Sequence, residues 1–95
     1  MRLGRARRER TPMTVNLHPH ARERLDERGA SEEEIILAVE AGEKFEAKFG
    51  RVGFRRNVPF KKQWRGKRYK TKQIEAYAIW RYNGWLVISV VTRYF

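Results

Sequence analysis

The stretch QIEAYAIWRYNGWLVISVVTRYF, residues 73–95, decides the fold. It contains two apolar segments rich in β-branched and aromatic residues, separated by Asn83-Gly84, a dipeptide preferred in two-residue hairpin turns. Such a turn would pair Tyr82 with Trp85, and the same register would place Glu75 opposite Thr92. One face of the hairpin would then be apolar in its middle and polar at its open end, with Ile79, Leu86, Ile88, Tyr77 and Val90 followed by Glu75, Thr92, Gln73 and Tyr94. We expect the apolar part to pack against helices, with Ile79 and Ile88 as neighbours in the core.

Two helices are predicted in the first half of the chain. Pro19 suits the first turn of a helix, because proline lacks an N–H that would be unpaired there. Gly29 is a natural helix stop, so the first helix is expected over residues 19–28. Ser31 and Glu34 have the spacing of a capping box for a second helix that ends at Gly42. The predicted buried face of this helix consists of Ile35, Ile36, Ala38 and Val39.

The segments between the helices and the terminal hairpin read as strands. KFEAKFGRVGFRRNV, residues 44–58, alternates around a glycine-bounded turn and predicts a hairpin. Pro59 should interrupt it, and a basic stretch with a turn at Arg65-Gly66 follows, while Met13–Leu17 could form a short leading strand. The predicted fold is therefore α+β, with two N-terminal helices packed on an antiparallel sheet of about four strands in one domain, residues 13–95. Residues 1–12 are arginine-rich and predict a basic, disordered arm.

The composition favours a polyanionic partner. The 95 residues include 22 Lys and Arg against 11 Asp and Glu, a net charge of +11, which attracts RNA, DNA, an anionic membrane surface or an acidic protein. The absence of cysteine excludes disulfides, thiolate catalysis and thiolate metal sites, and no motif around the two histidines indicates a metal or a small-molecule cofactor. The longest apolar run, residues 85–91, is too short to cross a bilayer, and no signal peptide is evident. We therefore expect a cytoplasmic protein without a membrane partner.

The stretch HARERLDERGASEEEIILAVEAGE, residues 20–43, resembles the signature of a bacterial domain of unknown function. That domain is usually grouped with RelE-like proteins, in the barnase–colicin–RelE fold group of ribonuclease toxins. The resemblance covers residues 18–95 and is carried by His20, Arg24, Arg28 and Gly29, together with the closing VVTRYF. It implies a RelE-like fold, RNA or the ribosome as a partner, and an acidic antitoxin protein as another. Because many members have no assigned function, the resemblance is weakly specific for activity.

RNA cleavage without a metal requires a base, an acid and cations that stabilise the phosphorane. His20 can serve as an acid or a base near neutral pH, and Arg24, one helical turn further on, can contact phosphate. Glu75 is expected on the same face as Thr92 and Tyr94, which completes a candidate catalytic set. Arg93 would point to the opposite face. The alternatives are that Arg24 and His20 belong to a solvated, ion-paired helix face and that Glu75 is a cross-strand partner.

The basic stretch supplies the candidate RNA contacts. Cations would hold phosphates while bases stack on Phe60, Trp64 and Tyr69. The candidate RNA-binding residues are Arg28, Lys61, Lys62, Trp64, Arg65, Lys67, Arg68, Tyr69 and Lys72. The predicted function is an RNA-binding, toxin-type endoribonuclease. The alternatives are a non-catalytic RNA- or ribosome-binding module, a protein-interaction domain for an acidic partner and, for the basic stretch, a charged edge that prevents aggregation.

Overall fold

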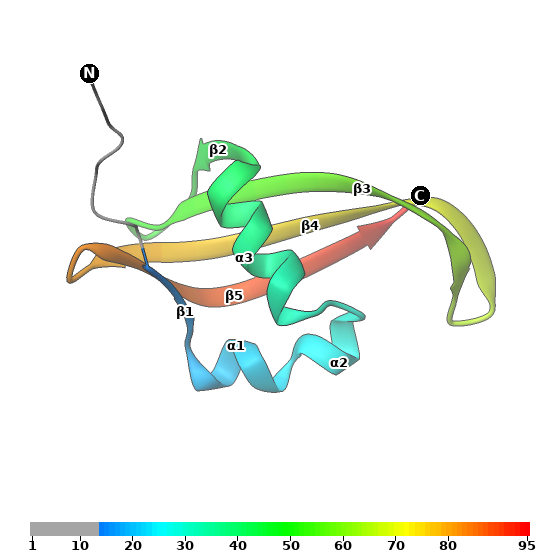
Figure 1. Ribbon diagram of the computed structural model, residues 1–95, viewed down its shortest axis with the longest axis horizontal. Helices are drawn as coiled ribbons and strands as arrows, with labels where there is room; N and C mark the ends of the chain where they lie inside the picture. Colours follow the sequence, from blue (N-terminus) through cyan, green and yellow to red (C-terminus); the bar gives the residue numbers. More distant parts are fainter. Residues whose placement is uncertain (1–13) are drawn as a thin grey trace, which may run out of the picture.

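The computed structural model describes residues 14–95 and consists of a five-stranded sheet with three short helices on one face (Figure 1). The sheet has the strand order β1-β5-β4-β3-β2, and every neighbouring pair is antiparallel except β1 and β5, which are parallel. The elements are β1 (Thr14–Leu17), α1 (Pro19–Glu23), α2 (Leu25–Arg28), α3 (Glu32–Ala41), β2 (Glu43–Glu46), β3 (Val52–Trp64), β4 (Lys67–Arg81) and β5 (Gly84–Tyr94).

The α+β class is therefore confirmed, but the sheet has five strands rather than about four. The three helices connect β1, at one edge of the sheet, with β2 at the opposite edge. β1 pairs with β5 in parallel and is the edge strand on that side. The predicted arm of residues 1–12 lies outside the described residues. Within residues 14–95, none of the helices has the length and apolar character needed to span a membrane.

The helices follow the predicted caps, with one difference. In α3 the Ser31 hydroxyl accepts the Glu34 N–H at 3.2 Å and the Glu34 carboxylate accepts the Ser31 N–H at 3.0 Å, so the capping box is confirmed. The first predicted helix is instead broken at Arg24, whose N–H bonds to the carbonyl of Ala21, three residues back, at 3.1 Å. This tighter turn divides the segment into α1 and α2. Gly29 ends α2 with a φ of 72°, a left-handed conformation that favours glycine.

The core lies between the helices and one face of the sheet. Ile35 of α3 is fully buried, and the helices also contribute Ala21, Leu25, Ala38 and Val39. The sheet contributes the side chains of one face only, chiefly Phe54, Ile74, Ala76, Ala78, Trp85, Val87 and Val90. We call this the helix-covered face. The opposite face, on which no helix among residues 14–95 lies, is the open face; it carries Arg55, Glu75, Tyr77, Ser89 and Arg93.

The register of the terminal hairpin differs from the prediction. The turn residues are Tyr82 and Asn83, with φ values of 54° and 60°, and Arg81 pairs with Gly84. Gly84 is needed elsewhere, because a side chain there would collide with Thr14 of the neighbouring β1. Its smallness thus serves the contact between strands rather than the turn.

A β-bulge between Tyr77 and Ala78 then shifts the register once more. Glu75 consequently pairs with Val91, and Thr92 pairs with Ile74. The prediction that Glu75 shares a face with Thr92 and Tyr94 is wrong, as is the prediction of Ile79 and Ile88 as core neighbours. Ile79 pairs instead with Leu86.

The strands β3 and β4 continue beyond the end of β5 and form a two-stranded arm, residues 60–70, which projects at one end of the molecule (Figure 1). We call it the β3–β4 arm. Pro59 does not interrupt β3; a bulge between Pro59 and Lys62 follows it, with Lys61 at a φ of 52°. The turn at Arg65-Gly66 is confirmed, with both residues at positive φ.

Candidate functional site

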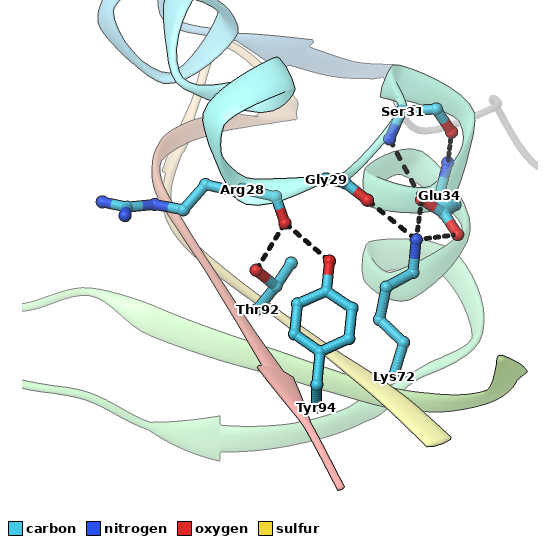
Figure 2. A network of polar contacts seen from close by, with 7 residues as sticks. All are labelled: Arg28, Gly29, Ser31, Glu34, Lys72, Thr92 and Tyr94. Carbon is cyan, nitrogen blue, oxygen red and sulfur yellow. Dashed lines mark hydrogen bonds and ion pairs between the residues drawn. The ribbon is translucent and has the colours of Figure 1, made fainter. Parts of the chain in front are cut away.

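Three of the predicted site residues secure the connection between α2 and α3 (Figure 2). The Thr92 hydroxyl donates to the carbonyl oxygen of Arg28 at 2.6 Å, and the Tyr94 hydroxyl donates to the same oxygen at 2.9 Å. This carbonyl lies in the last turn of a helix, where it has no partner within the helix. Lys72 donates from Nζ to the carbonyl of Gly29 and to the Glu34 carboxylate, each at 2.9 Å.

The burial of these groups indicates a structural role. Lys72 is only 6% exposed, although it is a lysine on a strand, and its ammonium is neutralised by Glu34. Arg28 also turns inward, donating from Nε to the carbonyl of Val90 at 3.2 Å. The polar groups of Thr92, Tyr94 and Lys72 are therefore used in holding the α2–α3 connection on the sheet. We call Arg28, Gly29, Glu34, Lys72, Thr92 and Tyr94 the connection cluster.

The aromatic residues of the β3–β4 arm pack against the same cluster. The Trp64 ring stacks on Tyr94, with centroids 5.0 Å apart and an interplanar angle of 18°. Phe60 and Tyr69 approach Tyr94 at 5.1 Å and 5.7 Å. These rings are engaged with one another, so they fold the arm back onto the domain rather than stand ready to stack with bases.

The cations of the arm, by contrast, are exposed. They are Lys61, Lys62, Arg65, Lys67, Arg68 and Lys70. Arg65 is partly committed, because its guanidinium donates to the carbonyl of Glu27 at 2.9 Å. The arm therefore has exposed cations on its surface, while its aromatic rings pack against Tyr94.

His20 and Arg24 lie on α1 and at its C-terminus, and both are exposed. The Arg24 guanidinium pairs with Glu27 at 3.5 Å, and the N–H of His20 donates to Nδ1 of His18 at 3.1 Å. Neither forms a polar contact with the terminal hairpin within the described part of the chain. The structure thus does not bring the imidazole of His20 together with Glu75, Thr92 or Tyr94.

Glu75 lies on the open face among groups that were not expected beside it. The residue is 3% exposed, and its carboxylate accepts from the Tyr77 hydroxyl at 2.7 Å and from Nε of Arg93 at 3.1 Å. Arg55 is its cross-strand partner on β3 and in turn pairs with Glu43 at 3.3 Å. We call Arg55, Glu75, Tyr77 and Arg93 the Glu75 cluster.

Burial and hydrogen bonding shift the pKa values of two groups in this cluster. Burial by itself would raise the pKa of the Glu75 carboxyl, but the hydrogen bonds from Tyr77 and Arg93 and the charges of Arg93 and Arg55 outweigh it, so the pKa is lowered. Burial raises the pKa of the Tyr77 phenol, and Glu75 raises it further. At neutral pH the cluster therefore combines an ionised carboxylate, a protonated phenol and two guanidinium groups.

The position of Tyr77 beside Glu75 could be predicted from the sequence, because residues two apart on a strand share a face. Arg93 was already expected on the face away from Thr92. What placed it beside Glu75 is the bulge in the hairpin, and nothing in the residue pattern marks that position.

Charge is divided between the helical layer and the sheet. Residues 14–46 contain nine acidic residues and only four Lys or Arg. Residues 52–95 contain a single acidic residue, Glu75, and eleven cations: Arg55, Arg56, Lys61, Lys62, Arg65, Lys67, Arg68, Lys70, Lys72, Arg81 and Arg93. The three long strands thus form the basic part of the molecule.

No cluster of three His, Asp or Glu side chains in residues 14–95 could hold a metal ion. A comparison with known protein families, curated proteins and solved structures found no match to the chain.

Proposed function

We propose that the protein is an RNA-binding domain of RelE-like type, in which the long strands and the β3–β4 arm contact the phosphate backbone. The observation that carries the proposal is the division of charge, with eleven cations and one carboxylate in β3 to β5 and the excess of acid in the helical layer. Such a distribution attracts a polyanion to one part of the surface. The resemblance described above favours RNA over DNA.

The arm is suited to this role because its cations are exposed while its rings are packed inward. Lys61 and Lys62 are both exposed, and neither forms a salt bridge within the described residues. The cations of α1 are different: Arg22 pairs with Glu32, and Arg24 pairs with Glu27. Free cations gain most from phosphate, because they give up no internal partner on binding.

This contrast supplies the test. In the double variant Lys61→Gln/Lys62→Gln, binding of a labelled single-stranded RNA should weaken, and the slope of log affinity against log salt should fall by roughly 1.4, about 0.7 for each phosphate that a lysine no longer neutralises. The matched double variant Arg22→Gln/Arg24→Gln should retain both affinity and slope. Equal reductions in the two variants would mean that net charge alone drives binding and would contradict an interface on the arm.

A second candidate function is RNA cleavage, which the Glu75 cluster favours. The Glu75 carboxylate would accept the proton of a ribose 2′-OH as its oxygen attacks phosphorus and the bond to the 5′-oxygen breaks. The leaving oxygen would take a proton from the Tyr77 phenol. Arg93 and Arg55 would stabilise the negative charge of the phosphorane. This assignment keeps Glu75 from the predicted catalytic set and replaces His20 and Arg24, which lie on α1 and at its C-terminus and form no hydrogen bond with Glu75.

Cleavage is tested by incubating the protein with total RNA and EDTA. If the Glu75 cluster is the site, Glu75→Gln should reduce the cleavage rate by at least about 100-fold, the size expected for loss of general base catalysis. His20→Ala should leave the rate unchanged. Loss of activity in His20→Ala with full activity in Glu75→Gln would return the site to α1. Absence of cleavage by the unaltered protein would leave RNA binding as the function.

A further inference from the structure

The open face contains a hollow of about 430 Å³ beside the turn between β2 and β3. Its walls include three aromatic residues, two cations and a hydroxyl: Phe45, Phe49, Tyr77, Lys48, Arg51 and Ser89. Phe45, Tyr77 and Ser89 come from three different strands, and in the sheet they lie in one row across Gly53. The hollow is therefore built by the tertiary fold and not by a single loop.

Two of the aromatic walls are held in place. The rings of Phe45 and Tyr77 meet edge to face, with centroids 6.0 Å apart, and the Tyr77 hydroxyl is fixed by its hydrogen bond to Glu75. Gly53 makes this contact possible, because a side chain there would collide with the Phe45 ring. Arg55, in turn, lies over the Phe45 ring at 4.4 Å. A ligand entering the hollow would meet a preformed aromatic surface.

Phe49 has no structural reason to be aromatic. It occupies the tip of the turn with a φ of 62°, and it is 86% exposed. For a bulky residue this left-handed conformation costs on the order of 1–2 kcal/mol, and Gly or Asn would form the turn more easily. The ring adds nothing to the core. An exposed, strained phenylalanine at the rim of a hollow is accounted for if a ligand covers it.

The charges beside the rings define the ligand further. The Arg51 guanidinium lies 5.9 Å from the centre of the Phe49 ring, and Lys48 precedes that ring in the chain. No carboxylate among residues 14–95 lines the hollow. A flat aromatic group joined to an anion matches this combination, since aromatic rings stack with bases and guanidinium groups bind phosphate.

We propose that this hollow binds one nucleobase of single-stranded RNA, stacked on Phe49, with the adjoining phosphate held by Arg51 and Lys48. The proposal rests on the RNA-binding function proposed above and adds the site at which a base, rather than the backbone, is held. Tyr77 lines the hollow and also donates to Glu75, so the hollow and the Glu75 cluster adjoin. A nucleotide bound in the hollow would therefore lie beside Tyr77, the residue that the hollow shares with the Glu75 cluster.

The test maps backbone amide shifts by nuclear magnetic resonance during titration with each of the four nucleoside 5′-monophosphates and, separately, with ribose 5-phosphate. The nucleotides should shift the amides of residues 48–51 and Ser89, whereas ribose 5-phosphate, which lacks the base, should leave them nearly unchanged. Equal shifts with both probes would mean a simple anion site and overturn the proposal. So would the absence of shifts at these amides, as expected if the hollow receives a side chain of a partner protein instead.

Two variants complete the test with a labelled single-stranded RNA. Phe49→Ala should weaken its binding roughly 5- to 150-fold, the equivalent of about 1–3 kcal/mol for a stacked base, without changing the salt slope. Arg51→Gln should weaken binding and lower the slope. The matched control is Leu37→Ala, which removes another exposed apolar side chain, 41% exposed on α3 in the acidic helical layer, and it should bind normally.

The two proposals fail in distinguishable ways. RNA affinity that is unchanged in Phe49→Ala but reduced in Lys61→Gln/Lys62→Gln would end the hollow proposal and leave the RNA-binding function standing. Nucleotide shifts at residues 48–51 in a protein that binds no RNA would keep the base site and end the RNA-binding function.

Discussion

The two faces of the sheet use polar residues in opposite ways. On the helix-covered face, Lys72, Thr92 and Tyr94 direct their polar groups to carbonyls at the end of α2, where each satisfies a group that the helix leaves unpaired (Figure 2). On the open face, Glu75 and its neighbours bond to one another beside a hollow. The comparison shows that the polar groups of Lys72, Thr92 and Tyr94 hold the helices on the sheet, whereas those of Glu75, Tyr77 and Arg93 contact one another on a face that no helix among residues 14–95 covers.

The largest loss of stability is expected from Gly29→Ala, which disturbs the connection cluster on the helix-covered face. The new methyl group would meet the Tyr94 hydroxyl and the Trp64 ring, and the residue would be strained at a φ of 72°. We expect a decrease of roughly 2–4 kcal/mol in the free energy of unfolding, measured with urea. Gly50→Ala is the matched control, with a φ of 71° and no atom within 4 Å, and should cost about 1 kcal/mol. Equal decreases would mean that the connection cluster is not tightly packed.

The next largest effect is expected from Lys72→Met. It removes the ammonium that pairs with Glu34 and bonds to the Gly29 carbonyl in a site where Lys72 is 6% exposed. We expect a decrease of roughly 2–3 kcal/mol in stability, since Glu34 remains partly solvated. Lys70→Met, two residues earlier on the exposed arm, should be nearly neutral for stability. A Lys72→Met variant that is as stable as the unaltered protein but no longer binds RNA would contradict the structural role assigned to Lys72.

On the open face, Glu75→Gln should cost on the order of 1–2 kcal/mol at neutral pH, because it removes the charge that holds Arg93 and Tyr77. The pKa of Glu75 is lowered in the folded protein. Its contribution to stability is therefore complete above about pH 4.3, the ordinary pKa of a glutamate, and is lost as the pH falls through the lower folded value. Urea unfolding of both proteins from pH 7 to pH 2 should show the difference shrinking only in acid. A stability difference that grows in acid would mean that the pKa of Glu75 is raised and not lowered. Glu40→Gln, at an exposed position, is the control and should show little difference at any pH.

The smallest effect is expected from Thr92→Val and Tyr94→Phe. Both hydroxyls donate to the carbonyl of Arg28, so each can compensate in part for the other, and each single variant should be destabilised by only about 0.5–1 kcal/mol. The double variant should be destabilised by more than the sum of the two. RNA binding and any cleavage should be unchanged in all three. A single variant that is stable but inactive would place function on the helix-covered face after all.

Much of the architecture could be predicted from local patterns. The capping box at Ser31, the stop at Gly29, and the turns at Arg65-Gly66 and after Phe45 are all set by residues close together in the chain, and all are present. Local hydrogen bonding and backbone preferences decide such features, so their signals survive in the sequence.

The candidate site could be predicted only in part. Glu75 was singled out, but its assigned neighbours Thr92 and Tyr94 lie on the other face, and His20 and Arg24 are exposed on and beside α1. The break at Arg24 also separates those two residues from Arg28, which turns inward to Val90. A helix stripe read from spacing assumes an unbroken helix, and here the helix is broken.

By itself, the sequence determined the α+β class, the capping box that begins α3, the glycine that ends α2, and a chain whose long strands carry many cations and one carboxylate. Only the tertiary structure decided which side chains meet. Gly84 lies against Thr14 of β1, and the turn consists of Tyr82 and Asn83, one residue earlier than predicted. The bulge between Tyr77 and Ala78 then shifts the register again. Because side chains on a strand alternate between faces, the one-residue shift at this bulge places Glu75 on the opposite face of the sheet from Thr92 and Tyr94. That choice depends on contacts between distant segments, and no local pattern encodes it.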